Sequence, residues 1–166
     1  MKLLITYSSK TGNTKKLAEG LYNNLPFKEM DIMPIADVRN IDEYDTVLVG
    51  YWVDRAFPNK EAKIFMEQIS GKRVGIFATL GAYPDSQHAW DSLVNGENIV
   101  KENNTVIGKF ICQGKIDPRI VEMFKNLPNG KGHELTPERL KKYSIAERHP
   151  NEIDILAAVD LFKDRI

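Results

Sequence analysis

Short apolar runs alternate along this chain with stretches in which apolar residues recur at helical spacing. The strand-like runs cover residues 2–7, 28–33, 44–53, 73–80 and 105–113. Helical spacing marks residues 14–25, 60–69 and 86–103, which lie between strand-like runs. Because two parallel strands need a crossover, which is usually a helix, this order predicts an α/β fold: a parallel sheet with helices on both faces.

Two of the strand-like runs, "TVLVGYW" and "VGIFATL", are apolar almost without interruption. Such runs are typical of strands that are buried on both faces, as in the middle of a parallel sheet. The chain has 166 residues and contains neither an internal repeat nor a Ser/Gly-rich linker. We therefore expect a single domain over residues 1–166.

The pattern loosens after the fifth strand-like run. Residues 118–127 and 136–147 are two short helix candidates, joined by "PNGKGHE". A last helix is expected to open at Pro150, since proline suits a first helical turn. Its apolar residues can then pack on the sheet: Ile153, Ile155, Leu156, Val159 and Phe162.

Composition and charge exclude several classes of function. Lys plus Arg (23) equals Asp plus Glu (23), so no overall positive field favours nucleic acid or an anionic membrane as a partner. No apolar run approaches the roughly 20 residues that a bilayer-spanning helix needs. Met1 and Lys2 lead straight into a strand-like run, which leaves no room for a signal peptide, so a cytoplasmic location is expected.

Cysteine and histidine give no indication of a catalytic or metal site. The single cysteine, Cys112, lies in an apolar run, where a buried and inert thiol is expected. The three histidines, His88, His133 and His149, are far apart and lack the spacing of metal ligands. We expect no metal ion and no catalytic side chain.

The segment "SSKTGNT", residues 8–14, connects the first strand to the first helix. In an open parallel sheet this turn lies at the ligand-binding edge, and a helix N-terminus presents unpaired N–H groups there. Gly12 allows close backbone approach, and the neighbouring short side chains can donate hydrogen bonds. The segment spells neither a P-loop nor a dinucleotide fingerprint, so a single phosphate is favoured. The alternative is that Asn13 or Thr14 merely caps the helix.

The longer stretch "ITYSSKTGNTKKLAEGL" resembles the phosphate loop of flavodoxins and flavodoxin-like FMN proteins. The resemblance implies a three-layer sandwich around a five-stranded parallel sheet in the order 2-1-3-4-5, with helices on both faces. It also implies flavin mononucleotide (FMN) as the cofactor. Backbone amides and hydroxyls of six residues would then hold the 5′-phosphate: Ser9, Lys10, Thr11, Gly12, Asn13 and Thr14.

Two later loops, "GYWVDRAFPN" and "TLGAYPDSQ", follow the third and fourth strands and would meet the flavin ring. Trp52 and Tyr83 would cover its two faces, since a large planar ring needs aromatic partners. Backbone groups of Thr79, Gly81 and Ala82 would face the pyrimidine edge. The other expected contacts in these loops are Tyr51, Val53, Asp54 and Leu80. The alternative is that Trp52 is a core residue that continues its strand.

The first of these loops departs from many flavodoxins, which place a glycine where a peptide flips toward the reduced flavin. Asp54, Arg55 and Ala56 stand in that region. Alanine makes a positive φ costly, which disfavours strong stabilisation of the one-electron semiquinone.

The resemblance implies an electron carrier that shuttles electrons between redox partner proteins, such as flavin or iron–sulfur reductases and acceptor enzymes. The alternative is an FMN-dependent NAD(P)H:quinone or small-acceptor reductase, with residues 117–152 helping to form a substrate pocket. Net neutrality favours this alternative slightly, because carrier flavodoxins are typically acidic. A third reading is a binding module that has lost the cofactor.

Overall fold

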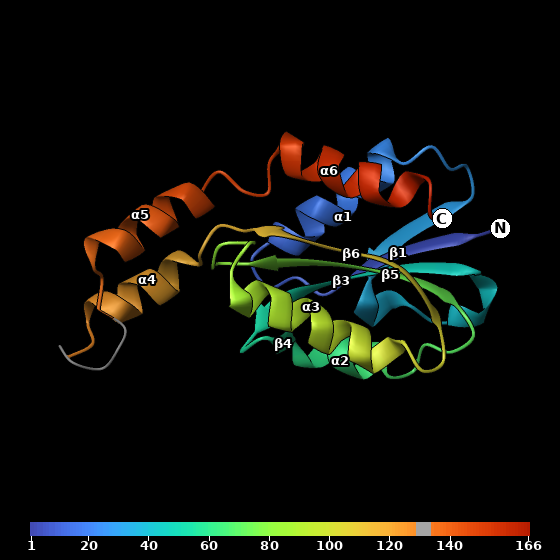
Figure 1. Ribbon diagram of the computed structural model, residues 1–166, viewed down its shortest axis with the longest axis horizontal. Coiled ribbons are helices and arrows are strands. Elements are labelled where there is room, and N and C mark those ends of the chain that lie inside the picture. Colours follow the sequence, from blue (N-terminus) through green and yellow to red (C-terminus); the bar gives the residue numbers. More distant parts are fainter. Residues whose placement is uncertain (129–133) are drawn as a thin grey trace.

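A parallel sheet forms the centre of the computed structural model, which describes residues 1–128 and 134–166 (Figure 1). Its long strands lie side by side in the order β2 (Met30–Pro34), β1 (Leu3–Tyr7), β3 (Thr46–Asp54), β5 (Arg73–Leu80) and β6 (Thr105–Gln113). The predicted parallel order 2-1-3-4-5 is therefore confirmed for the long strands. The expected count of five is wrong, because a sixth strand, β4 (Phe57–Pro58), pairs antiparallel with β3. Two residues are too short a run for hydrophobic periodicity to reveal.

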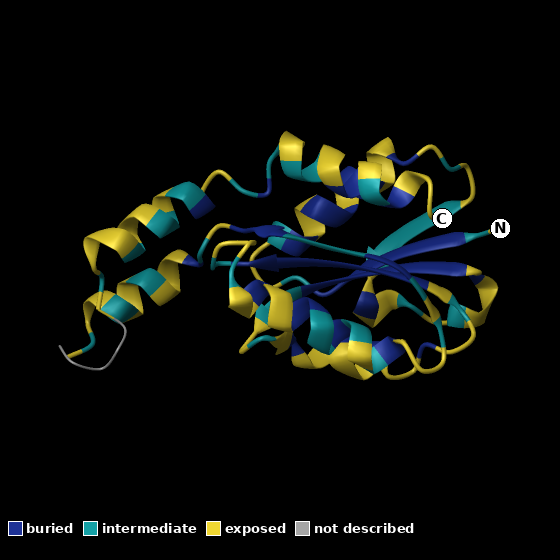
Figure 2. Ribbon diagram, in the orientation of Figure 1, coloured by how far each residue is buried: buried dark blue, intermediate teal, exposed yellow. Residues whose placement is uncertain are grey.

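Helices cover both faces of the sheet, as the alternating pattern predicts. Figure 1 shows α1 (Asn13–Asn24) and α6 (Glu152–Lys163) on one face, and α2 (Lys60–Met66) and α3 (Gln87–Val100) on the other. Successive residues of a strand point to opposite faces. Leu48 accordingly packs with α1 and α6, whereas Val47 and Val49 pack with α2 and α3. The central strands are thus buried on both sides (Figure 2).

The element ends differ from the expected ones by a few residues. The third strand starts at Thr46 instead of residue 44, because the short 3-10 turn η2 (Ile41–Glu43) precedes it. Another short turn, η1 (Ile35–Asp37), follows β2 directly. The last helix does not open at Pro150, so that prediction is wrong. Asn151 caps it instead, since Asn151 Oδ1 accepts from the Asp154 N–H at 3.1 Å and Asp154 Oδ2 accepts from the Asn151 N–H at 2.8 Å.

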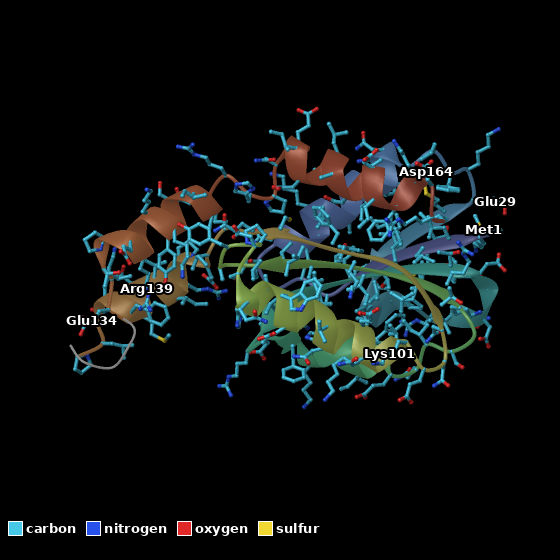
Figure 3. All side chains as sticks on the ribbon, in the orientation of Figure 1. Met1, Glu29, Lys101, Glu134, Arg139 and Asp164 are labelled. Atoms are coloured by element: carbon cyan, nitrogen blue, oxygen red, sulfur yellow. The ribbon has the colours of Figure 1, made fainter. Side chains whose placement is uncertain are left out.

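The two short helices after β6 form an arm that projects beyond the sheet, α4 (Pro118–Lys125) and α5 (Pro137–Ala146). No residue of α4 is buried, and Ala146 is the buried residue of α5. Glu134 and Arg139 lie on this arm, at the opposite end of the molecule from Met1 and Glu29 (Figure 3).

A tight two-residue turn joins β3 to β4. Asp54 pairs with Phe57 across it, and the two turn residues, Arg55 and Ala56, have positive φ values of 51° and 64°. Positive φ at both positions is the geometry of a type I′ hairpin turn, which favours glycine at the second position. Ala56 therefore adopts a positive φ, which is costly for alanine. Asn95 of α3 holds it there, since Asn95 Nδ2 donates to the Ala56 carbonyl oxygen at 2.7 Å.

Replacing Ala56 by glycine should stabilise the protein. A left-handed backbone costs a residue with a Cβ about 1–2 kcal/mol, and glycine offsets part of the gain through its more flexible unfolded state. We expect Ala56→Gly to raise the free energy of unfolding in urea by about 0.5–1 kcal/mol. The same change at the exposed Ala157 of α6 should lower it by about 1 kcal/mol. Equal losses for both variants would contradict the turn geometry.

Candidate functional site

A cleft lies at the sheet edge where β1, β3, β5 and β6 have their carboxyl ends, and we call it the edge cleft. Its volume is ≈ 170 Å³. Parallel strands all end at the same edge, so loops far apart in sequence meet there. The lining residues come from four segments: Lys10, Thr11 and Asn13; Trp52 and Val53; Thr79, Leu80 and Gly81; and Gly114, Lys115, Ile116, Asp117 and Ile120.

The loop between β1 and α1 leaves the start of the helix open. Gly12 is the N-cap residue, with φ of 98°, and no side chain in the described parts of the chain caps α1. The later helices α3 to α6 differ, because each has a cap side chain: Ser86, Asp117, Thr136 and Asn151. The alternative that Asn13 or Thr14 caps α1 is therefore wrong. The N–H groups and the positive dipole end of α1 are available to an anion.

Thr14 is tied into the sheet. Its Oγ1 lies 2.9 Å from Oγ1 of Thr79 on β5, and both side chains are buried. Asn13 also has a partner, because its Nδ2 donates to the Lys115 carbonyl oxygen at 2.9 Å. These bonds fix the start of α1 against β5 and against the segment after β6, and neither of them uses a backbone N–H of α1.

The beginning of the same loop is held from the other side. Ser8 Oγ donates to a carboxylate oxygen of Glu61 and accepts from Asn59 Nδ2 at 2.8 Å. Asn59 in turn donates its backbone N–H to the Trp52 carbonyl oxygen at 3.2 Å. The loop after β1 and the end of β3 are thereby fixed relative to each other.

Trp52 lies beside the loop. It is only partly buried, pairs in register with Thr79, and carries the Lys10 ammonium over its ring at 5.5 Å from the centroid. The alternative that Trp52 is an ordinary core residue is therefore not what the structure shows. Its neighbour Tyr51 takes the core position instead. Tyr51 is fully buried, donates its hydroxyl to the Ser92 carbonyl oxygen at 2.9 Å, and has a pKa that burial raises to about 12.

The structure brings together eight of the predicted site residues: Lys10, Thr11, Asn13, Trp52, Val53, Thr79, Leu80 and Gly81. The others do not line the edge cleft: Ser9, Gly12, Thr14, Tyr51, Asp54, Ala82 and Tyr83. Tyr83 is 39% exposed in the segment that follows β5. Its place over a flavin face stays a prediction.

The segment after β6 lines the edge cleft, although none of its residues was among the predicted FMN contacts. A Cβ at Gly114 would lie 2.6 Å from Asn13 Nδ2, so only glycine permits this approach. Asp117 caps α4 and forms an ion pair with Arg119, whose hydrogen bonds hold the pKa of the Asp117 carboxyl below its ordinary value. The stretch "QGKID" begins with the last residue of the predicted strand 105–113. A loop at this end of a parallel strand lies at the ligand-binding edge, and this was the signal that could have identified these residues.

Cys112, His88 and His149 do not line the edge cleft. Cys112 is buried, and burial raises the pKa of its thiol well above the ordinary value, which confirms an inert thiol. His149 Nδ1 lies 2.6 Å from Asp154 Oδ2, His88 is exposed, and His133 falls outside the described residues. Within residues 1–128 and 134–166, no three His, Cys, Asp or Glu side chains are grouped as metal ligands. In the same ranges, no helix has the length and apolarity to cross a membrane.

Known proteins resemble this chain over most of its length. The family model described as a flavodoxin domain matches residues 4–163. A flavodoxin-like domain-containing protein, BilS, of Clostridioides difficile is 33% identical over 163 residues, which cover 95% of this chain and 92% of that protein.

Solved structures show the same fold. A flavoprotein of Lactobacillus acidophilus, crystallised in complex with FMN, has a TM-score of 0.55 at 19% identity, over 75% of this chain and 99% of that one. A flavodoxin from the domain Archaea has a TM-score of 0.53 at 18% identity, over 96% and 99% of the two chains.

The buried threonine pair should be measurable in the stability of the protein. Thr14→Val keeps the side-chain shape but leaves the Thr79 hydroxyl buried without its partner. We expect the free energy of unfolding in urea to fall by about 1–3 kcal/mol. Thr11→Val, at an exposed position of the same loop, should change it by less than about 0.5 kcal/mol. Equal effects of the two substitutions would show that the pair does not form in solution.

Proposed function

Because this chain belongs to the flavodoxin family, we propose that it binds FMN in the edge cleft and carries electrons between redox partner proteins. The observation that carries the proposal is the uncapped N-terminus of α1 beside Gly12, at the edge where Trp52 and the end of β5 also lie. FMN, when bound, supplies the one- and two-electron chemistry. The protein's own residues bind it and orient it.

The phosphate end of the cofactor fits the loop after β1. Residues 9–14 offer backbone N–H groups at a helix N-terminus, except Gly12, whose N–H donates to Ser9 Oγ at 3.2 Å. The Ser9 and Thr11 hydroxyls add short donors. The Lys10 ammonium lies in the same cleft and can balance a phosphate charge. Thr14 would act through its backbone N–H, because its hydroxyl bonds Thr79.

The ring end fits the apolar part of the cleft. Trp52, Val53, Leu80 and Ile116 supply apolar walls, and Trp52 supplies an aromatic face for stacking. The enclosed volume of ≈ 170 Å³ takes only part of a flavin, so the remainder would lie over the rim. Tyr83 follows Gly81 and Ala82 at that rim, where its side chain can cover the outer face of the ring.

The side chains of the cleft support a carrier more than an enzyme. Its titratable groups are Lys10, Lys115 and Asp117, and Asp117 is engaged by Arg119. Passing electrons through a bound flavin requires no general acid or base from the protein. The partners would be flavin or iron–sulfur reductases on the donor side and acceptor enzymes on the other.

A reductase of quinones or other small acceptors, with NAD(P)H as the electron donor, is the second candidate. A larger cleft of ≈ 680 Å³ next to Trp52 favours it, because small acceptors need a pocket of their own. The balanced charge of the chain also weakens the case for docking through a strongly acidic surface.

Trp52→Ala should weaken FMN binding by about tenfold or more, because it removes an aromatic stacking partner and its buried area. The measurement is the quenching of FMN fluorescence during titration with protein. Trp90→Ala is the matched control: Trp90 is the other tryptophan, lies on α3 and is 58% exposed. Its loss should leave FMN affinity unchanged. Equal affinity in the two variants would place the ring elsewhere.

Riboflavin serves as the control ligand in the same titrations, since it has the ring but lacks the phosphate. Wild-type protein should bind it about a hundredfold more weakly than FMN, because several charge-assisted hydrogen bonds are lost. A protein that binds the two equally would not use the loop after β1 as a phosphate site.

The electron-carrier and reductase hypotheses predict different rates of NAD(P)H oxidation by the protein alone. We expect the FMN-loaded protein, mixed with NADPH or NADH and menadione, to show no steady oxidation of the nicotinamide at 340 nm. After chemical reduction, it should pass its electrons to an acceptor protein such as cytochrome c. Steady nicotinamide oxidation by the protein alone would overturn the carrier reading in favour of the reductase.

A further inference from the structure

A second cleft adjoins the far side of Trp52, and we call it the outer cleft. It lies between the 35–38 segment after β2, the end of β3 and the exposed side of α2. Its volume is ≈ 680 Å³, within the range of roughly 300–1,000 Å³ that is usual for small-molecule sites. Apolar side chains supply six of its lining residues: Ile35, Ala36, Val38, Trp52, Ile64 and Phe65.

Ile64 is the apolar residue of α2 that lies in this cleft and outside the two cores. Ala62 and Met66 are the residues of α2 that are buried in the core. Ile64 is apolar but 48% exposed, and Phe65 packs one side against that core while remaining only partly buried. An outward helix face of this size is normally polar, so exposed apolar side chains beside a cavity indicate a ligand surface.

The polar groups of the outer cleft restrict what it can hold. Asp54, Lys60 and Glu61 bring two negative charges and one positive charge, and Glu61 is already hydrogen-bonded to Ser8. A charged ligand would therefore find no strong opposite charge. A flat and uncharged aromatic molecule can contact Trp52, Ile64 and Phe65 at once.

Asn59 adds a hydrogen-bonding requirement. It lines the outer cleft and is only 3% exposed, and its Oδ1 accepts no hydrogen bond from any residue in the described ranges. Its Nδ2 is occupied, because it donates to Ser8 Oγ at 2.8 Å. Buried polar atoms are nearly always satisfied, so a ligand that carries an O–H or N–H donor suits this cleft better than one without.

We propose that the outer cleft is a binding site for a planar, uncharged aromatic molecule that carries a hydroxyl or N–H donor. The molecule would lie against Trp52 and α2 and donate its hydrogen bond to Asn59 Oδ1. Trp52 lines both clefts, so an occupant of the outer cleft and the cofactor proposed for the edge cleft would share one side chain. The two ligands are then coupled, and each changes the affinity of the other by the same factor. Only this coupling rests on the proposed function.

The probe is 2-naphthol, an uncharged aromatic alcohol at pH 7, titrated by calorimetry into wild-type protein with and without FMN. We expect saturable binding in both cases, with affinities that differ between them. Ile64→Glu puts a charge on the apolar wall and should weaken the binding by more than about tenfold. The matched control is Ile153→Glu, because Ile153 lies on α6 and is 77% exposed. This variant should bind 2-naphthol like the wild type.

The donor is tested with 2-methoxynaphthalene, which cannot donate and should bind about fivefold more weakly. Equal binding of the two probes would remove Asn59 from the proposal. Unchanged binding by Ile64→Glu, no binding by the wild type, or full displacement of FMN by 2-naphthol would overturn the site itself.

FMN titration of the same samples separates the two proposals, because Ile64→Glu should keep its FMN affinity. Protein that binds FMN but not 2-naphthol refutes only this inference, and the reverse result refutes only the proposed function.

Discussion

The parallel hydrogen-bonding ladder of β1, β3 and β5 determines where every other feature of the molecule lies. Parallel strands end at one edge, and each return crossover has to run along a face of the sheet. The loop after β1, Trp52 near the end of β3 and the end of β5 therefore meet at one place, although they are far apart in sequence. The two cores on the two faces then keep that edge rigid.

The loop after β1 is anchored on both sides and left open in the middle. Ser8 is held by Asn59 and Glu61, and Thr14 is held by Thr79. Between these anchors, the chain turns at Gly12 and presents the start of α1. A binding loop that is already ordered loses little conformational entropy when a ligand arrives, so more of the contact energy appears as affinity.

Strand order, helix positions and most of the edge cleft were predictable from the sequence, because hydrophobic period and loop chemistry are local. The burial of Tyr51 was also predictable, because it lies inside the nearly continuous apolar run of the third strand. The hydroxyl bond of Thr14 and the approach of Gly114 to Asn13 were not, because they depend on how strands distant in sequence pack. At Pro150, the proline signal was overridden by the capping box that Asn151 forms with Asp154.

The arm formed by α4 and α5 starts directly at the cleft and buries almost nothing in the body of the protein. Each of its helices carries its own N-cap, Asp117 in α4 and Thr136 in α5, and neither helix contributes to the two hydrophobic cores. Changes on the exposed faces of the arm therefore leave the packing of the sheet in place. Ile120 of α4 also lines the edge cleft, so substitutions on the arm can reshape the wall of that cleft while the strands beneath it stay as they are.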